Sequence, residues 1–201
     1  MIDIETLDTK DSAIVLSIGG CVFNGESLLS IETLKRKSIY LELNPYEQET
    51  KGRTISVSTL FWWVQQKPPG LNKFIKESYD SIKYSLNTLN QFITENDVKS
   101  IWSKSPSFDM IILTSLFNNF ELKLPIDFRN WYDVRTINLV RKILNIPYPS
   151  FNGEVHNALD DAANQALVIN EVVHHLKSRK PIPEIIKQQE FDLVIDLMED
   201  S

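Results

Sequence analysis

Two acidic residues near the start of the chain could bind a metal ion together. Asp3 and Glu5 are two positions apart, and isoleucines occupy positions 2 and 4. In an extended strand this spacing places both carboxylates on one face and the isoleucines on the other. Adjacent carboxylates repel each other unless a cation lies between them, and hard cations such as Mg²⁺ and Mn²⁺ prefer oxygen ligands. The pair therefore predicts further acids and a base from elsewhere in the chain.

Candidates for these partners occur in the middle and near the end of the chain. Asp109 opens an apolar helical stretch, and the run from His156 to Asp161 contains a histidine and two aspartates. Each also has an ordinary structural interpretation, as a helix cap or as an acid favoured in a first helical turn. The residue pattern alone leaves the choice between Asp160 and Asp161 open, since the helix start is uncertain by a turn.

The acidic pair lies on the first of three expected strands. Residues 2–6 and the apolar, β-branched run 13–23 are typical of strands, and alternation over 38–43 predicts a third. Gly19-Gly20 predicts a bend or bulge, and Asn24-Gly25 a hairpin-type turn. Together these elements predict an antiparallel meander that begins with the strand of Asp3.

The remaining pattern is mainly helical. Pro68-Pro69-Gly70 ends one expected helix, and Asp133 is typical of an N-cap. The expected helices cover 59–66, a stretch ending near 95, 108–120, 134–144, 157–177 and part of the tail 181–201, with one short strand at 98–102. Without repeats or an obvious linker, we expect one domain over residues 1–201, with 181–201 as a C-terminal helical tail.

Composition limits the class of protein. A chain of 201 residues can bury a core without disulfides, and its single cysteine, Cys21, excludes an internal disulfide. We expect no membrane span or signal peptide, and a cytoplasmic location, which is the host cytoplasm if a phage encodes the chain. A net charge of −6 argues against binding nucleic acid mainly through Lys and Arg, but not against an enzyme that reaches phosphates through metal ions.

Four stretches in order resemble the signature motifs of the DEDDh 3′→5′ exonucleases, most closely the phage exonuclease A type and its bacterial exoribonuclease relatives. They are Met-Ile-Asp-Ile-Glu-Thr-Leu (1–7), Trp-Ser-Lys-Ser-Pro-Ser-Phe-Asp (102–109), Asp-Val-Arg-Thr (133–136) and His-Asn-Ala-Leu-Asp-Asp-Ala (156–162). The resemblance implies an α/β, RNase H-like fold, in which helices flank a mixed five-stranded sheet whose first three strands are antiparallel.

The resemblance also implies a two-metal mechanism. It gives the catalytic and metal-binding acids as Asp3, Glu5, Asp109 and Asp161, which would hold two Mg²⁺ or Mn²⁺ ions. His156 would be the general base, and histidine exchanges protons near neutral pH. The spacing of histidine and aspartate in the family selects Asp161 over Asp160, which we expect to be a solvated acid.

Residues beside these motifs are candidates for substrate contacts. Thr6, Leu7 and Phe108 must border the metal site, because they are adjacent in sequence to Glu5 and Asp109. The aromatic run 61–63 could stack on bases, but its clustering in a helical octet favours core packing. For the basic runs 35–37 and 177–180 we expect solvated surfaces.

The leading hypothesis is a metal-dependent 3′→5′ exonuclease that releases 5′-mononucleotides from single-stranded 3′ ends. DNA or mixed specificity is slightly favoured, and an exoribonuclease specialised for RNA 3′ tails is an alternative. The second hypothesis is a catalytically silent nucleic-acid-binding or assembly module on the same fold. The third hypothesis is an unrelated metal-binding hydrolase. The presence of all five motif residues counts against the silent module. Whether the protein forms a homodimer is left open by the sequence.

Overall fold

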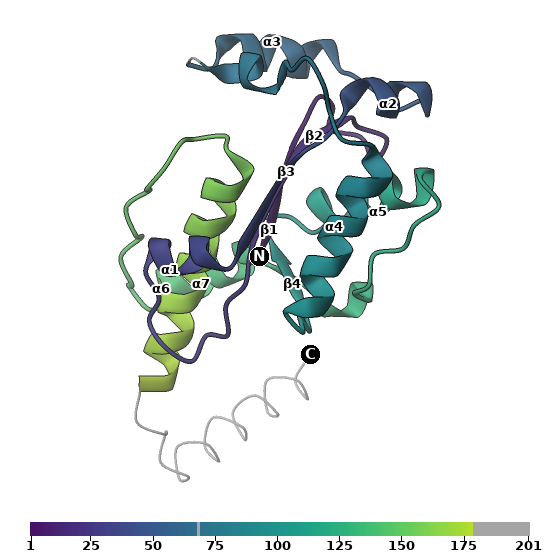
Figure 1. Ribbon diagram of the computed structural model, residues 1–201. Coiled ribbons are helices and arrows are strands. Elements are labelled where there is room, and N and C mark those ends of the chain that lie inside the picture. The colour runs from purple at the N-terminus through teal and green to yellow at the C-terminus, as the bar shows by residue number, and fades with distance from the viewer. Residues whose placement is uncertain (68, 179–201) are drawn as a thin grey trace, which may run out of the picture.

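The structure, a computed structural model, describes residues 1–67 and 69–178, and helices lie on both sides of a central sheet (Figure 1). The strands are β1 (Ile2–Thr6), β2 (Val15–Cys21), β3 (Ser38–Glu42), β4 (Ile101–Ser103) and β5 (Trp131–Asp133). The α-helices are α1 (Ile31–Arg36), α2 (Pro45–Thr50), α3 (Val57–Gln65), α4 (Ile82–Glu95), α5 (Asp109–Asn119), α6 (Val134–Ile143) and α7 (Ala158–Ser178). Two 3₁₀ helices, η1 (Gly70–Phe74) and η2 (Phe128–Asn130), complete the elements of the described residues.

The first three strands form an antiparallel sheet in the order β1-β2-β3, as the sequence predicts. The link from β2 to β3 is not the hairpin that Asn24-Gly25 suggests, because α1 lies between the two strands. Gly25 does adopt a left-handed backbone, with φ of +66°. The turn signal was therefore correct locally, but it opens a longer connection.

The other two strands, β4 and β5, pair in parallel as a separate two-stranded sheet. β4 lies close to β1 but does not extend the first sheet within the described residues. The backbone of Ile4 hydrogen-bonds instead to the carboxylate of Asp109, and β4 is only three residues long. The structure thus has an α/β architecture with three antiparallel strands, and the expected single five-stranded sheet is divided in two.

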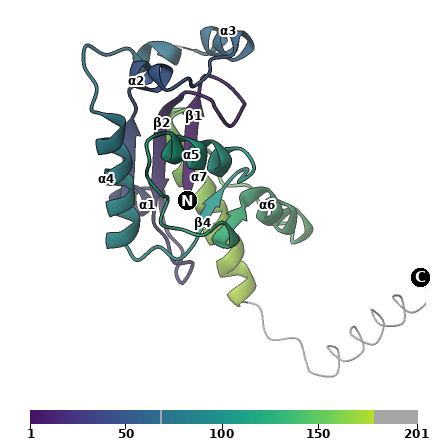
Figure 2. The ribbon, with the colours of Figure 1, turned by 90° about the vertical axis from the view of Figure 1, so that its right-hand side faces the viewer.

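Helices cover both faces of the antiparallel sheet. The face of Ile2 and Ile4 packs on α4 and α5, whereas the opposite face packs on α7, with α1 and α6 against α7 (Figures 1 and 2). Because β1 alternates, its acids point to the α7 side. The amphipathic pattern of the first strand therefore determines which helix meets the carboxylates.

A glycine sets how closely α7 approaches the sheet. Gly19 lies opposite Asp3 in the β1–β2 pairing, and a Cβ atom on Gly19 would lie 2.1 Å from the carbonyl carbon of Ala158. The start of α7 therefore rests directly on the strand backbone, a contact that no larger residue permits. The expected bulge at Gly19-Gly20 is wrong, since β2 is regular there and the pairing irregularity lies between Glu5 and Thr6.

A separate hydrophobic cluster joins α3 and η1 to the end of β1, and it consists of Leu7, Ile14, Leu16, Trp63 and Phe74. Trp63 is 1% exposed, and its Nε1 atom donates to the carbonyl of Thr6 at 2.9 Å. Core packing was thus correct for Trp63 but wrong for Phe61 and Trp62, which are 65% and 41% exposed. A nine-residue helix on one side of the domain buries only one face, so consecutive aromatic residues cannot all be internal.

Most remaining elements lie near their predicted positions. The helix N-cap at Asp133 is confirmed, because its side chain accepts a hydrogen bond from the backbone of Arg135 at 2.8 Å. The short helices α1 and α2 were missed, and the strand expected at 98–102 is β4, which begins three residues later and ends one residue later than predicted. The predicted helix in 181–201 lies outside the described residues. No helix among the described residues combines the length and the apolar character needed to cross a membrane.

Candidate active site

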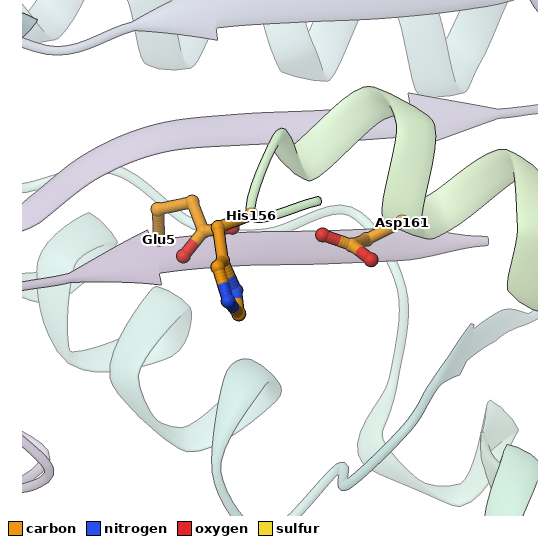
Figure 3. Close-up of side chains that lie close together, drawn as sticks. All are labelled: Glu5, His156 and Asp161. Carbon is orange, nitrogen blue, oxygen red and sulfur yellow. The ribbon is translucent and has the colours of Figure 1, made fainter. Parts of the chain in front are cut away.

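Three of the predicted side chains meet between β1 and the start of α7. One potential ligand atom from each of Glu5, His156 and Asp161 lies within 4.8 Å of the other two. Figure 3 shows Glu5 on its strand, His156 on the loop before α7 and Asp161 on the first turns of that helix, all bordering the same space. Residues separated by some 150 positions in the chain are therefore brought together by the contact between α7 and β1.

The start of α7 decides which of two aspartates enters this space. The side chain of Asn157 accepts hydrogen bonds from the backbones of Leu159 and Asp160 at 3.1 and 3.2 Å, so it acts as the N-cap. Asp161 then lies in the second half of the first turn and faces the sheet. Its backbone N–H donates to the carbonyl of Asn157 at 2.8 Å.

Asp160 points away from the site, but it is not the solvated acid we expected. Its carboxylate accepts a hydrogen bond from the backbone of Glu154 at 2.7 Å and pairs with Lys35. Lys35 therefore has a defined partner, which corrects the expectation of a purely solvated basic run. The backbone of Gly153 fits against Asp160, since a Cβ atom there would lie 2.4 Å from Oδ2. Asp160 thus shapes the loop that carries His156.

Asp109 reaches the site from the other side of β1. It is the first residue of α5, it is 5% exposed, and hydrogen bonds from the backbones of Ser105 and Ile4 stabilise its charged form. Asp109 does not act as the N-cap, since Phe108 holds that position and no side-chain cap is made. The negative charges of Asp109 and Glu5 both act on Asp3.

Burial and mutual repulsion disfavour the charged forms of these acids. Desolvation, followed by the charges of Asp109, Glu5 and Asp161, raises the pKa of Asp3 well above its ordinary value. Desolvation, together with the charge of Asp161, raises the pKa of Glu5 to about 8. Desolvation raises the pKa of Asp109 to about 6 and also raises that of Asp161, where the charge of His156 opposes it. The cluster holds more negative charge than the surrounding protein compensates.

The donor set fits hard divalent cations. Gln165 donates from Nε2 to Asp3 Oδ1 at 2.8 Å, while its own Oε1 is buried and accepts no hydrogen bond from the described residues. Acceptor oxygens thus outnumber donors at this point, which is the imbalance that a cation and its bound waters relieve. All four acids offer oxygen ligands of the type that Mg²⁺ and Mn²⁺ prefer.

His156 is held in an unusual backbone conformation at the edge of the site. Its φ is +63°, and its ring packs edge-on against Trp62 with a centroid distance of 4.7 Å. The Nζ atom of Lys73 donates to the carbonyl of His156 at 2.6 Å. Aromatic and cationic side chains from the α3–η1 segment thus surround the histidine.

The predicted substrate contacts are mostly engaged inside the protein. Thr6 is 8% exposed and donates from its hydroxyl to the carbonyl of Asp8 at 2.7 Å, and Leu7 is 6% exposed in the cluster with Trp63. Phe108 is partly buried against the core of α4 and α5. Thr6 and Leu7 therefore offer almost no surface to a substrate, because they pack against the hydrophobic cluster of Trp63.

Three residues at the site were not singled out from the sequence for what they do there. Gln165 could have been found, because it lies four residues after Asp161 and hence on the same helix face. Trp62 was considered for base stacking and assigned to the core. Lys73 lies in an irregular segment without periodicity, and nothing in the sequence associates it with His156.

Comparison with known proteins identifies a family. The family model of the 3′-5′ exoribonuclease Rv2179c-like domain matches residues 1–173, a range that includes the four acids and the histidine: Asp3, Glu5, Asp109, Asp161 and His156. No curated protein and no solved structure matches the chain.

Proposed function

Because this chain belongs to the 3′-5′ exoribonuclease Rv2179c-like family, and so is an exonuclease, we propose that it removes 5′-mononucleotides from the 3′ ends of single-stranded RNA. The observation that carries the proposal is the convergence of Glu5, His156 and Asp161 within 4.8 Å from three separate elements. Nothing in the packing of β1 on α7 requires acids there, so their repulsion is explained best by a metal-dependent reaction.

We assign the metal ligands to Asp3, Glu5, Asp109 and Asp161, and the preferred ions to two Mg²⁺ or Mn²⁺. When bound, such ions polarise the attacking water and offset the negative charge that develops on the departing 3′ oxygen. Gln165 fixes one oxygen of Asp3 by hydrogen bonding, which leaves the other oxygen for a ligand role.

His156 would accept the proton of the attacking water. Its side chain is partly exposed, it lies within reach of Glu5 and Asp161, and it comes from a loop instead of a rigid helix. A general base must lie within hydrogen-bond reach of the proton that it takes, and this position meets the requirement for a water held between the acids.

The substrate is proposed to be RNA and not DNA, because the family is described by an exoribonuclease activity. This revises the slight preference for DNA that the sequence alone suggested. The exposed face of Trp62 beside His156 offers a stacking surface for an unpaired base, and Phe61, next to Trp62 in the sequence, is also exposed. Because the chain carries a net charge of −6, the metal ions would supply much of the positive charge that attracts the phosphates.

We further propose that the fold is RNase H-like and that the activity is of the DEDDh type. Support comes from the antiparallel order β1-β2-β3, from β4 lying beside β1, and from the helices on both faces. The division between β1 and β4 would then be local, arising where Asp109 takes the hydrogen bond of Ile4.

The test uses 5′-labelled single-stranded RNA and DNA of the same sequence, incubated with Mg²⁺, Mn²⁺ or EDTA and resolved at single-nucleotide steps. We expect a metal-dependent ladder that shortens from the 3′ end, with RNA cleaved faster than DNA. His156→Ala and Asp161→Asn should each slow the reaction by ~10²-fold or more. Asp160→Asn is the matched control, since the side-chain oxygen of asparagine can still accept the hydrogen bond of the Glu154 backbone that holds the loop.

Two outcomes would contradict the proposal. Undiminished cleavage in excess EDTA would exclude a metal-dependent reaction. A folded protein that produces no ladder on either substrate would favour the silent binding module on the same fold.

A further inference from the structure

The loop that presents His156 needs an external support. A φ of +63° is uncommon for a residue with a side chain and persists only where surrounding contacts impose it. The five preceding residues, 151–155, are all exposed, so the loop has almost no core of its own. Position 156 itself is only partly buried. The side chains of Asp160 and Asn164 on α7 hydrogen-bond to the backbones of Glu154 and Asn152, whereas the contacts at His156 itself come from the α3–η1 segment.

Lys73 provides the shortest of these contacts. Its Nζ atom donates to the carbonyl of His156 at 2.6 Å and pairs with the carboxylate of Glu154 at 3.2 Å. The side chain is only 13% exposed, and its ammonium lies over the rings of Phe74 and Trp63 at 5.0 and 6.0 Å. A charged group held by two acceptors and two rings has a fixed position, and charge-assisted hydrogen bonds are the strong ones.

The element that carries Lys73 is itself attached to the catalytic strand. η1 packs through Phe74 into the cluster of Leu7 and Trp63, and Trp63 donates to the carbonyl of Thr6, next to Glu5. A chain of contacts therefore runs from β1 through α3 and η1 to the loop of His156, independently of α7. This chain fixes the histidine relative to the acids from the side opposite the helix.

We propose that Lys73 is a positioning residue for the general base: its ammonium group holds the backbone of His156 in the conformation that directs the imidazole toward Glu5 and Asp161. This inference rests on the proposed function, and it goes beyond it by assigning a role to a residue that belongs to none of the acidic motifs. Lys73 acts through His156 and not on the substrate.

A competing role for Lys73 is direct contact with an RNA phosphate. Its charge does act on Glu5, so the ammonium is near the reacting groups. The two roles predict different kinetics. Loss of a positioning residue lowers kcat and leaves KM nearly unchanged, whereas loss of a phosphate contact raises KM.

The experiment compares Lys73→Met with Lys83→Met, an exposed lysine that pairs with Glu121 on the surface. Methionine retains the apolar stem over the rings and removes the ammonium, both its donor and its charge. We expect kcat to fall about 10- to 100-fold in Lys73→Met, since small displacements of a catalytic group have effects of this size. KM should remain within about twofold, and Lys83→Met should behave as the unmodified protein.

The decisive measurement repeats the substitution in a His156→Ala background. If Lys73 acts through His156, Lys73→Met has no further effect there, because the group that it positions is absent. A full additional loss of kcat in that background, or a rise in KM with kcat unchanged, would overturn the proposal.

A second variant guards against a folding defect. Lys73→Cys can be treated with bromoethylamine in the native state, which alkylates the new thiol and restores an ammonium at nearly the original length. Cys21, the sole native cysteine, is 2% exposed, and burial raises the pKa of its thiol, so the reaction is selective for position 73. Recovery of kcat supports the proposal, and complete modification without recovery refutes it.

Hydrogen exchange separates failure of this inference from failure of the proposed function. The N–H of Asn157 donates to the carbonyl of Glu154 at 3.2 Å within the loop. We expect exchange of the 151–157 peptide to accelerate in Lys73→Met, whether or not the protein degrades RNA. Unchanged exchange would show that Lys73 does not hold the loop, and an inactive parent protein with accelerated exchange would refute only the exonuclease assignment.

Discussion

Replacing Glu5 by glutamine should stabilise the metal-free protein above neutral pH. Glu5 has a pKa of about 8, compared with 4.5 for a free glutamate, because it is buried next to Asp161. The folded state therefore retains a proton that the unfolded state loses. The free energy of unfolding therefore has its full value below pH 4.5, where both states are protonated, and falls as the pH rises toward 8. Glutamine has nearly the same shape and cannot ionise, so it avoids the loss.

The size of the effect follows from the same pKa values. Each pH unit between the unfolded and folded pKa costs ~1.4 kcal/mol, so the ionisation of Glu5 in the unfolded state lowers the free energy of unfolding by up to ~3 kcal/mol at pH 7. Relaxation of neighbouring groups reduces this, and we expect a net gain of ~1–3 kcal/mol for Glu5→Gln. For a chain of this length that corresponds to a rise in Tm of roughly 2–12 °C.

The assay is thermal unfolding at pH 5, 7 and 8.5, in EDTA and in excess Mn²⁺. In EDTA the two proteins should melt together at pH 5 and separate as the pH rises, with Glu5→Gln the more stable. Mn²⁺ should raise the Tm of the parent protein more than that of the variant, because a ligand that binds only the folded state stabilises it by mass action. Glu49→Gln, at an exposed position on α2, is the control.

Two results would refute this reasoning. If Glu5→Gln melted below the parent protein in EDTA at pH 8.5, the carboxylate would be stabilising as a charge. An equal shift with Mn²⁺ in both proteins would place the metal away from Glu5.

Three further predictions test how the site is built. Gly19→Ala should destabilise the protein by about 1–3 kcal/mol and reduce exonuclease activity, because its Cβ would displace the start of α7. Gly20→Ala is the control, since a Cβ at Gly20 comes no closer than 3.2 Å to another atom, and melting and activity are measured for both variants. Asp160→Asn should keep its activity within a few-fold and its shift in Tm with Mn²⁺, whereas Asp161→Asn should lose both. Equal losses of activity and of the Tm shift in the two variants would mean that the aspartates were assigned wrongly. Trp62→Ala should raise the KM for RNA by roughly 5- to 100-fold if its exposed ring stacks on a base, and an unchanged KM would exclude that contact.

The alternation around Asp3 shows how much a short pattern can determine. Because the period of a strand is two, the sequence settles that Asp3 and Glu5 share a face and that Ile2 and Ile4 fill the core on the other. The helices that carry Asp109 and Asp161 were likewise predictable, since their apolar stripes repeat over several turns. Short helices such as α1 and α2 were missed because six residues give too few repeats for a period to be recognised.

The acids and the histidine are thus a property of the sequence, whereas their arrangement and support depend on tertiary structure. Gly19-Gly20 has the local signature of a bulge, and only the approach of α7 shows that Gly19 instead makes room for Ala158. Likewise, Trp62 and Trp63 are indistinguishable as residues, yet the docking of α3 buries one and leaves the other against His156. Side-chain chemistry and periodicity are local quantities that the sequence contains, but close approach and burial are decided by elements distant in the chain, which no local pattern specifies.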